Sequence, residues 1–409
     1  MKKILFFTLP FWGHINPNID IIIQLSQTYK VLCVTLKNYS DIFFKNEIDI
    51  LEYPDSLVEY YGNGIISKST NIEKKYYASQ YLMSEMLHIN KRSIELLENI
   101  WFEIGLDIIE FAPDLIISDT YAFWGPPIAN KINVKYINIE SATDMKDKVQ
   151  DKYFKKYLQD VVSKEINLEI NTQEIIKNSN IINRQQNKKF EKFAGCNKES
   201  YSQPLITLAH MTKSLQLAAD DMIIPYKYMG FDLEINDMPN KEDFIYISRG
   251  TINDNYNEMV LKNIISTFDC EKEYSVIVSC GVRADTIIQQ NTNPKIQIYK
   301  SVNQIEYLLK SKLFISHGGI TGIREAIICE TPVIIFPTTY HCYQVGIVME
   351  NIGGGILLKN HPFDKQELKV AISEIMNNKE YKKNIKELKY ELICEKRKND
   401  IFSVLNKYM

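Results

Sequence analysis

The sequence predicts an α/β protein with two doubly wound parallel-sheet domains that face each other across a cleft. Three observations carry this prediction. Short, continuously apolar runs alternate with segments of helical periodicity, which is typical of parallel strands buried on both faces. The alternation stops near residue 230 and resumes near residue 244. The chain has 409 residues, and at roughly 150 residues per domain this is enough for two or three domains.

In the first half, residues 1–230, six apolar runs have the length of strands. A loop at Pro10–Pro17 follows the first run, and helical spacing is present at Ile19–Leu25, within Ser69–Ile108 and after Thr120. Residues 144–200 are rich in Lys, Asn and Glu, and we expect surface helices there. The expected strands are Ile4–Leu9, Val31–Leu36, Ile48–Tyr53, Leu115–Ser118, Val134–Ile139 and Leu205–Leu208.

Residues 231–243 are acidic, contain Pro239 and lack a strong period, so we expect them to link the two domains. The second domain is expected at residues 244–380. Residues 381–409 are expected to form C-terminal helices that pack back on the first domain. The expected strands of the second half are Phe244–Ser248, Val276–Ser279, Ile296–Tyr299, Leu313–Ser316, Val333–Phe336 and Gly355–Leu358.

Composition excludes several classes of protein. Lys and Arg total 48 against 51 for Asp and Glu, so there is no overall positive charge to attract nucleic acid or an anionic membrane. The seven cysteines are dispersed without a CxxC pair, which fits a reducing cytosol better than a disulfide framework or a zinc site. The N-terminal apolar run stops at Pro10 and is too short for a signal peptide. No run approaches the ~18 apolar residues of a membrane span. We therefore expect a cytoplasmic protein.

The segment Leu313–Gly355 carries the clearest chemical signal. An apolar strand runs directly into His317, Gly318 and Gly319, and a helix starts immediately afterwards. Glycines let the backbone approach a bulky anion, and the amides at a helix N-terminus stabilise it. A glycine turn between a strand and a helix accounts for the triplet alone equally well. Glu325, further along the same helix, offers a carboxylate to ribose hydroxyls.

The whole segment, with its HGG triplet, Glu325-Ala326, a strand ending at Pro337 and a Gly-rich close, resembles the donor-binding signature of UDP-dependent glycosyltransferases. Its nearest likeness is to bacterial macrolide and natural-product glycosyltransferases with the GT-B fold. Further similar motifs follow in the family's order: Phe11–Pro17 (FWGHINP), Pro113–Trp124 (PDLIISDTYAFW), Tyr226–Gly230, Ser248–Thr251 (SRGT) and Val302–Leu308.

The resemblance implies inverting sugar transfer without a metal or a bound cofactor. His14 would be the general base that takes a proton from an acceptor hydroxyl. Asp119 would orient His14 and stabilise its imidazolium, as in a hydrolase triad. Taken alone, each residue is more often an ordinary structural polar group. The co-substrate would be a nucleotide sugar, a UDP- or dTDP-sugar, and the residues implied in binding it are Ser248, Gly250, Thr251, Val302, Gln304, His317, Gly318, Gly319, Thr321, Gly322, Glu325, His341 and Cys342.

Three departures from the family's pattern bear on the donor. Ser301 stands where an aromatic residue commonly stacks on uracil, and Thr321-Gly322 alters the helix start. Counting from Pro337 and from Gly353 places His341-Cys342 where an Asp-Gln pair usually binds sugar hydroxyls. A second register uses Gln344 instead. A deoxysugar, an amino sugar or a relative without catalysis are all compatible with this segment.

Three functions stay open from the sequence. The leading hypothesis is a glycosyltransferase that modifies a hydroxyl of a small natural-product acceptor, as in antibiotic biosynthesis. A second is a nucleotide-sugar epimerase of the same fold, and the His14–Asp119 pair argues against it. A third is an accessory or binding protein that keeps the fold without transfer. The expected partners are small molecules, without nucleic acid or integral membrane association, and the sequence does not fix the oligomeric state.

Overall fold

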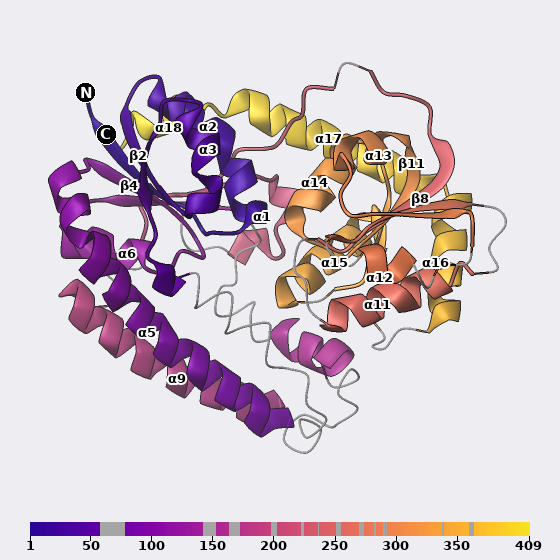
Figure 1. Cartoon of the computed structure of the whole chain (residues 1–409), viewed down its shortest axis with the longest axis horizontal. Helices are drawn as coiled ribbons and strands as arrows, with labels where there is room; N and C mark the ends of the chain where they lie inside the picture. The colour runs from indigo at the N-terminus through magenta and orange to yellow at the C-terminus, as the bar shows by residue number, and fades with distance from the viewer. Residues whose placement is uncertain are drawn as a thin grey trace.

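The computed structural model shows two α/β halves, each organised around one parallel sheet, with the first half on the left of Figure 1. The structure describes residues 1–57, 78–141, 153–162, 172–197, 203–221, 225–235, 237–250, 255–269, 274–281, 284–288, 291, 293–337, 339–359 and 364–409. Within this described part, no helix is long and apolar enough to cross a membrane.

The first sheet has seven strands in the order β3-β2-β1-β4-β5-β6-β7, and every pair is parallel. Its central strands are almost entirely buried, which explains why they read as continuous apolar runs. The strands are β1 Lys3–Phe7, β2 Lys30–Thr35, β3 Asp49–Glu52, β4 Leu115–Asp119, β5 Tyr136–Glu140, β6 Thr207–Ala209 and β7 Tyr226–Tyr228.

The second sheet has six strands in the order β10-β9-β8-β11-β12-β13, also parallel throughout. The predicted fold class is therefore confirmed. The strands are β8 Glu242–Ser248, β9 Ser275–Ser279, β10 Ile296–Tyr299, β11 Ser311–Ser316, β12 Val333–Ile335 and β13 Gly355–Leu357.

Helices cover both sheets. In Figure 1, α5 and α9 lie side by side as a long pair that extends away from the first sheet. The first half contains α1 Trp12–Ile15, α2 Ile19–Ser26, α3 Ser40–Phe44, α5 Ala78–Phe111, α6 Gly125–Lys131 and α9 Thr172–Ala194. The remainder of the chain forms α11 Asn255–Ser266, α12 Ala284–Ile288, α13 Gln304–Lys310, α14 Ile320–Ile328, α15 Tyr340–Ile352, α16 Lys365–Asn377, α17 Glu380–Lys398 and α18 Ile401–Leu405.

Four sequence-based expectations need correction. The loop expected at Pro10–Pro17 contains the four-residue helix α1. Strand β7 was not predicted, because its three residues are too few to show a period. Strand β8 begins at Glu242, inside the expected linker, because strand ends often lie outside the apolar run. Residues 153–162 are helical as expected but are not purely a surface element, since Leu158 and Val161 are buried.

Each sheet reverses its strand order once, and the sequence motifs lie at these two reversal points. The reversal lies between β1 and β4 in the first sheet and between β8 and β11 in the second. Ligands of doubly wound sheets bind beyond the carboxyl ends of the strands at such a switch point. The loop with His14 follows β1, and Asp119 ends β4. The SRGT segment follows β8, and His317 follows β11.

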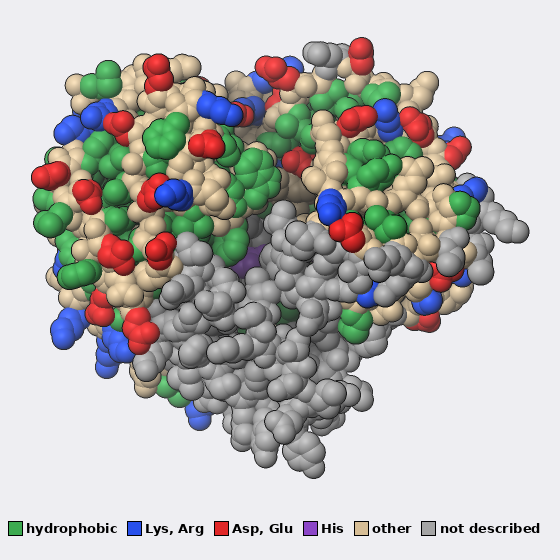
Figure 2. Space-filling model, viewed as in Figure 1, with side chains coloured by type: hydrophobic (Ala, Val, Ile, Leu, Met, Phe, Trp, Pro, Cys, Tyr) green, Lys and Arg blue, Asp and Glu red, His purple; other side chains and the backbone are tan. Residues whose placement is uncertain are grey.

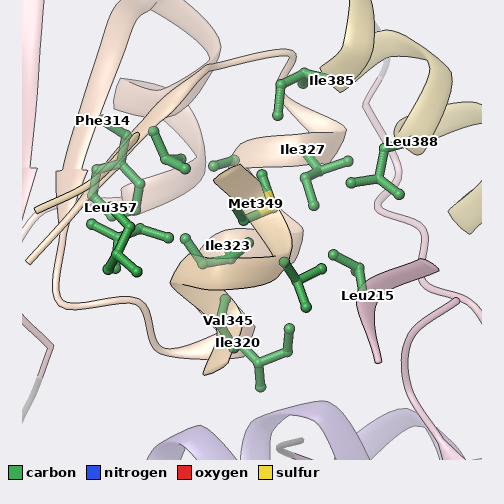
Figure 3. Close-up of a cluster of buried hydrophobic side chains, with 14 of the residues drawn as sticks. Leu215, Phe314, Ile320, Ile323, Ile327, Val345, Met349, Leu357, Ile385 and Leu388 are labelled. Atoms are coloured by element: carbon green, nitrogen blue, oxygen red, sulfur yellow. The ribbon is translucent and has the colours of Figure 1, made fainter. Parts of the chain in front are cut away.

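One of the apolar clusters contains residues of both halves. Leu215 of the first half packs with Ile320, Ile323 and Ile327 of α14, and α17 covers the same cluster (Figure 3). The linker leaves β7 through Gly230, which has φ of +66° and lies so close to α17 that an added Cβ would come within 2.2 Å of the Leu392 oxygen. Glycine is therefore required at this exit.

The last helix returns to the first half, as Figure 1 shows near both chain ends. Ile401, Val404 and Leu405 of α18 are buried in the core beneath β1 and β2. The preceding helix α17 packs instead on the second half. The domain boundaries expected from the sequence stay a prediction, but α17 and α18 bridge both halves.

Candidate active site

The junction between the halves holds a histidine–aspartate pair. His14 lies in α1, and its Nδ1 is 3.0 Å from Oδ2 of Asp119 at the end of β4. The Asp119 side chain is fully buried, whereas 20% of the His14 side chain is exposed. Figure 2 shows the hollow between the halves with histidine at its floor. Because a carboxylate only accepts hydrogen bonds, Nδ1 carries the proton and Nε2 is left to accept one.

Asp119 is held on both oxygens. Its Oδ1 accepts a hydrogen bond from the Tyr121 amide at 2.9 Å, while Oδ2 faces His14. The Tyr121 ring packs edge-on against the His14 ring, with centroids 5.5 Å apart. The pair is therefore fixed by the turn that follows β4. Such an oriented imidazole is suited to general-base catalysis.

In the second half, the loops after β8 and β11 meet around the His317 ring. An added Cβ on Gly250 would lie 2.6 Å from the His317 ring, and one on Gly319 would also lie 2.6 Å from it. Both glycines are therefore needed to accommodate the imidazole between the two loops. Ser248 is buried at the end of β8, and Arg249 donates to the Phe336 oxygen at 3.1 Å. Thr251 lies outside the described residues.

The His317 imidazole is neutral. Burial, aided by the Arg249 guanidinium, lowers its pKa to about 3. Its Nδ1 is buried and has no hydrogen-bond partner among the residues that the structure describes. The Gly318 amide donates to Ser316 Oγ at 3.1 Å, so it is used within the loop. The amides at the start of α14, after its N-cap Gly319, are those that a helix leaves for an anion.

The chain is similar to known glycosyltransferases along nearly its whole length. Residues 232–391 match the family described as UDP-glucoronosyl and UDP-glucosyl transferase. The chain is 23% identical over 401 residues to the UDP-glucosyltransferase YojK of Bacillus subtilis, covering 95% of this chain and 93% of the relative. It is 24% identical over 403 residues to the NDP-glycosyltransferase YjiC of the same organism, covering 96% and 94%. The chain thus resembles UDP-dependent glycosyltransferases: residues 232–391 match the family model, and the similarity to the two Bacillus proteins extends over nearly the whole length.

Solved structures of glycosyltransferases share the whole fold. A calicheamicin glycosyltransferase superposes with a TM-score of 0.68 at 12% identity, covering 97% of this chain and 95% of that one. A spinosyn forosaminyltransferase superposes with a TM-score of 0.66 at 15% identity, covering 99% and 98%. The chain therefore has the GT-B fold of these glycosyltransferases.

The predicted nucleoside-binding residues Gln304 and Glu325 come together where α13 begins beside α14. Gln304 begins α13 and its Nε2 donates to Glu325 Oε2 of α14 at 2.5 Å. Burial raises the pKa of Glu325, opposed by the Gln304 hydrogen bond and the neighbouring Arg324. An added Cβ on Gly322 would meet Gln304 Nε2 at 3.4 Å. Val302, just before α13, is partly buried against the core.

The His341-Cys342 segment opens α15, and its two side chains go to different places. His341 Nδ1 lies 3.0 Å from the Tyr121 hydroxyl of the first half. Cys342 is buried, and its sulfur accepts a hydrogen bond from the Thr339 hydroxyl at 3.2 Å. Gln344, the alternative in the second register, is also buried, at 1% exposure. Of these three, His341 is the one that faces the His14 side of the junction.

Several contacts across this junction were not predicted from the sequence. The hydroxyl of Thr321, a residue predicted to bind the nucleotide, donates to the Gly13 oxygen of the first half at 3.1 Å. Arg324, on the same helix, donates to the His210 oxygen. Tyr121 was inside a recognised motif, yet nothing in that motif indicated its partner His341. Contacts between residues that are far apart in the sequence leave no local sequence pattern. For Arg324, the available signal was a charged residue among the apolar positions of its helix.

Proposed function

We propose that the protein is an inverting glycosyltransferase that moves a sugar from a nucleoside-diphosphate donor to a hydroxyl of a small natural product. One observation carries the proposal. The oriented His14–Asp119 pair stands at the switch point of the first sheet and shares Tyr121 with the His341 segment of the second half. The predicted base and a predicted sugar-facing residue thus both contact one aromatic ring.

His14 Nε2 takes the proton of the acceptor hydroxyl as its oxygen bonds to the anomeric carbon. The bond from that carbon to the donor's phosphate oxygen breaks at the same time, so the nucleoside diphosphate leaves with the electron pair. Attack from the face opposite the leaving group inverts the anomeric configuration. Asp119 stabilises the imidazolium through its 3.0 Å contact with Nδ1.

The leaving diphosphate gains negative charge, and the second half supplies donors for it. We propose that these donors are the amides at the start of α14 and the His317 imidazole, which Gly250 and Gly319 enclose. Preorganised donors of this kind stabilise developing charge without reorganising. We propose that no divalent metal is needed.

Gln304 and Glu325 are proposed to hold the nucleoside. The names of relatives support a nucleotide-sugar donor, since YojK is called a UDP-glucosyltransferase and YjiC an NDP-glycosyltransferase. A structural neighbour, a spinosyn rhamnosyltransferase, was solved with thymidine diphosphate. A UDP- or dTDP-sugar is therefore the proposed donor class. We place the enzyme in the cytoplasm, because its cysteines are dispersed without a CxxC pair.

The test is incubation of the purified protein with a panel of UDP- and dTDP-sugars and a panel of hydroxylated natural products, read by mass spectrometry. A product heavier by one glycosyl unit, absent with His14→Ala, supports the proposal. Nucleotide binding without any transfer across the panels would indicate an accessory protein instead.

A further inference from the structure

The second half contributes a buried arginine, Arg324, to the junction between the halves. Arg324 of α14 is fully buried, which is rare for an arginine unless its guanidinium is paired. Its Nη1 donates to the His210 oxygen of the first half, and its Nη2 donates to Thr321 Oγ1 at 3.4 Å. The guanidinium carbon lies 4.7 Å from the centre of the Phe231 ring in the linker. One side chain therefore contacts both halves and the segment between them.

A first path of contacts leads from Arg324 to the backbone of the predicted base. His210 Nε2 lies 2.8 Å from Asn18 Oδ1, and Asn18 Nδ2 donates to the His14 oxygen at 2.7 Å. Asn18 Nδ2 also donates to Ser141 Oγ at 3.1 Å. Asn18 is fully buried and His210 is 5% exposed, so water does not compete for these bonds.

The hydrogen-bonding groups along this path determine which ring nitrogen of His210 carries the proton. Because Asn18 uses its amide nitrogen toward His14 and Ser141, its oxygen faces His210 and must accept from Nε2. Burial, together with the positive charge of Arg324, lowers the pKa of His210 well below its usual value. His210 is therefore a neutral imidazole with its proton on Nε2.

A second path is shorter. Thr321, which accepts from Arg324, donates its own hydroxyl hydrogen to the Gly13 oxygen at 3.1 Å. The two paths thus end on consecutive carbonyls, those of Gly13 and His14. Helix α14, from which both paths start, also carries Glu325.

We propose that Arg324 is a positioning residue that fixes the His14 imidazole relative to the donor half by holding the backbone of residues 13 and 14 through these two paths. The inference rests on the proposed function in that His14 is taken as the base. A displacement of about 1 Å at a reacting group can lower a rate by about 100-fold, so a fixed loop has a direct catalytic value.

The first experiment is hydrogen exchange of the full chain without substrates, and it does not depend on activity. Arg324→Met keeps an unbranched side chain and removes every donor. We expect exchange in residues 11–18 to rise by about 10-fold or more, since each bond to a charged group is strong. Thr321→Val cuts the second path and is expected to act in the same direction. If Arg324→Met does not fold, Thr321→Val carries the test alone.

Lys241→Met is the matched control. Lys241 is also a cation shielded from water in the second half, but its Nζ donates to the Leu308 and Cys329 oxygens and to Thr331 Oγ1, all within that half. This variant is expected to lower the melting temperature and leave exchange at residues 11–18 at the wild-type rate. Wild-type exchange in both Arg324→Met and Thr321→Val, or an equal rise in Lys241→Met, would overturn the inference.

The second experiment asks whether Arg324 acts through His14. We expect Arg324→Met to lower kcat by about 10- to 100-fold while the Kd for UDP changes by less than about threefold. In a His14→Ala background the same substitution is expected to cause no further loss. A full additional loss in that background would overturn the positioning role and leave the proposed function standing. A wild-type protein that transfers no sugar would refute the proposed function, and the exchange experiment would still decide the role of Arg324.

Discussion

The Tyr121 hydroxyl and the His341 Nδ1 lie 3.0 Å apart and join the two halves at the candidate active site. Their rings also meet edge-on, with centroids 5.0 Å apart. The Tyr121 ring also packs edge-on against His14. The position of His341 is therefore coupled to that of His14, the predicted base, through the Tyr121 side chain.

We expect Tyr121→Phe to raise the KM for the sugar donor by about 2- to 10-fold, the effect of one lost hydrogen bond. The ring packing is kept, so the fold and the Kd for UDP are expected to stay unchanged. Steady-state kinetics and calorimetry measure the two quantities. The control is Tyr29→Phe, whose hydroxyl contacts Asn406 of the C-terminal tail and lies away from the site. An unchanged KM in Tyr121→Phe would show that His341 does not need this partner.

His14→Ala is expected to lower turnover by about 10²- to 10⁴-fold, the usual contribution of a general base. The Kd for UDP is expected to change little, because the predicted nucleotide site is in the other half. Asp119→Asn is expected to act in the same direction, since the amide cannot stabilise the imidazolium as a carboxylate does. Circular dichroism checks that both variants fold. A folded His14→Ala protein with near-wild-type turnover would refute the assignment of the base.

The sequence was sufficient for the fold because each central strand is buried on both faces. The runs Ile4–Phe7 and Leu313–Ile315 have no polar interruption, so their type and order could be predicted. The misses have physical causes. Strand β7 has three residues and is only partly buried, and α1 is a single helical turn that has no period to detect.

Activity is expected to survive EDTA, because helix-end amides and His317 are proposed to stabilise the diphosphate in place of a cation. Turnover before and after chelation, with and without added magnesium, measures this. The control is the same EDTA treatment of a glycosyltransferase with a known metal requirement. Complete loss that magnesium or manganese restores would contradict this account of the leaving group.

Acid is expected to destabilise the protein through its buried neutral histidines. The pKa of His210 is held well below 6.5 in the folded state by burial, Arg324 and Lys396. Below pH 6.5 the His210 imidazole is therefore protonated in the unfolded chain but stays neutral in the folded protein. Stability falls as pH falls, by up to about 1.4 kcal/mol per pH unit for each such group.

The variant His210→Gln removes this one contribution and keeps a donor for Asn18. Urea unfolding at about pH 7.5 and about pH 5.5 is expected to show that the wild type loses about 1.4 kcal/mol more than the variant over this interval. Equal losses would mean that His210 is protonated in the folded protein.

The site could be predicted only as far as local motifs reach. Asp119 ends a recognisable strand, and His14 and His317 each lie in the segment that follows one, so the sequence predicted that they lie beyond the carboxyl ends of the sheets. Their partners across the junction could not be predicted in the same way. The Arg324–His210 bond spans 114 residues, and only the closure of the two halves brings its atoms together.

The unusual His341-Cys342 segment gives the last prediction. The His341 ring lies within hydrogen-bond distance of the Tyr121 hydroxyl, whereas the Cys342 sulfur accepts a hydrogen bond from the Thr339 hydroxyl. If this segment meets the transferred sugar, the double change His341→Asp with Cys342→Gln is expected to alter the ranking of donors, toward glucose, without abolishing UDP binding. A site with the wrong partners leaves sugar hydroxyls unpaired, at a cost of about 1–3 kcal/mol for each buried group.

The two single variants separate the contributions, and the structure predicts that they differ. His341→Asp, at the junction, is expected to carry most of the change in donor ranking. Cys342→Gln introduces a larger side chain at a position with 6% exposure, so it is expected to lower the melting temperature more than it alters selectivity. All three variants and the wild type are compared on one donor panel, with the Kd for UDP measured separately. An unchanged ranking in the folded double variant would refute the assignment and make Gln344 the next position to test, because in the second register its amide takes the place of Cys342.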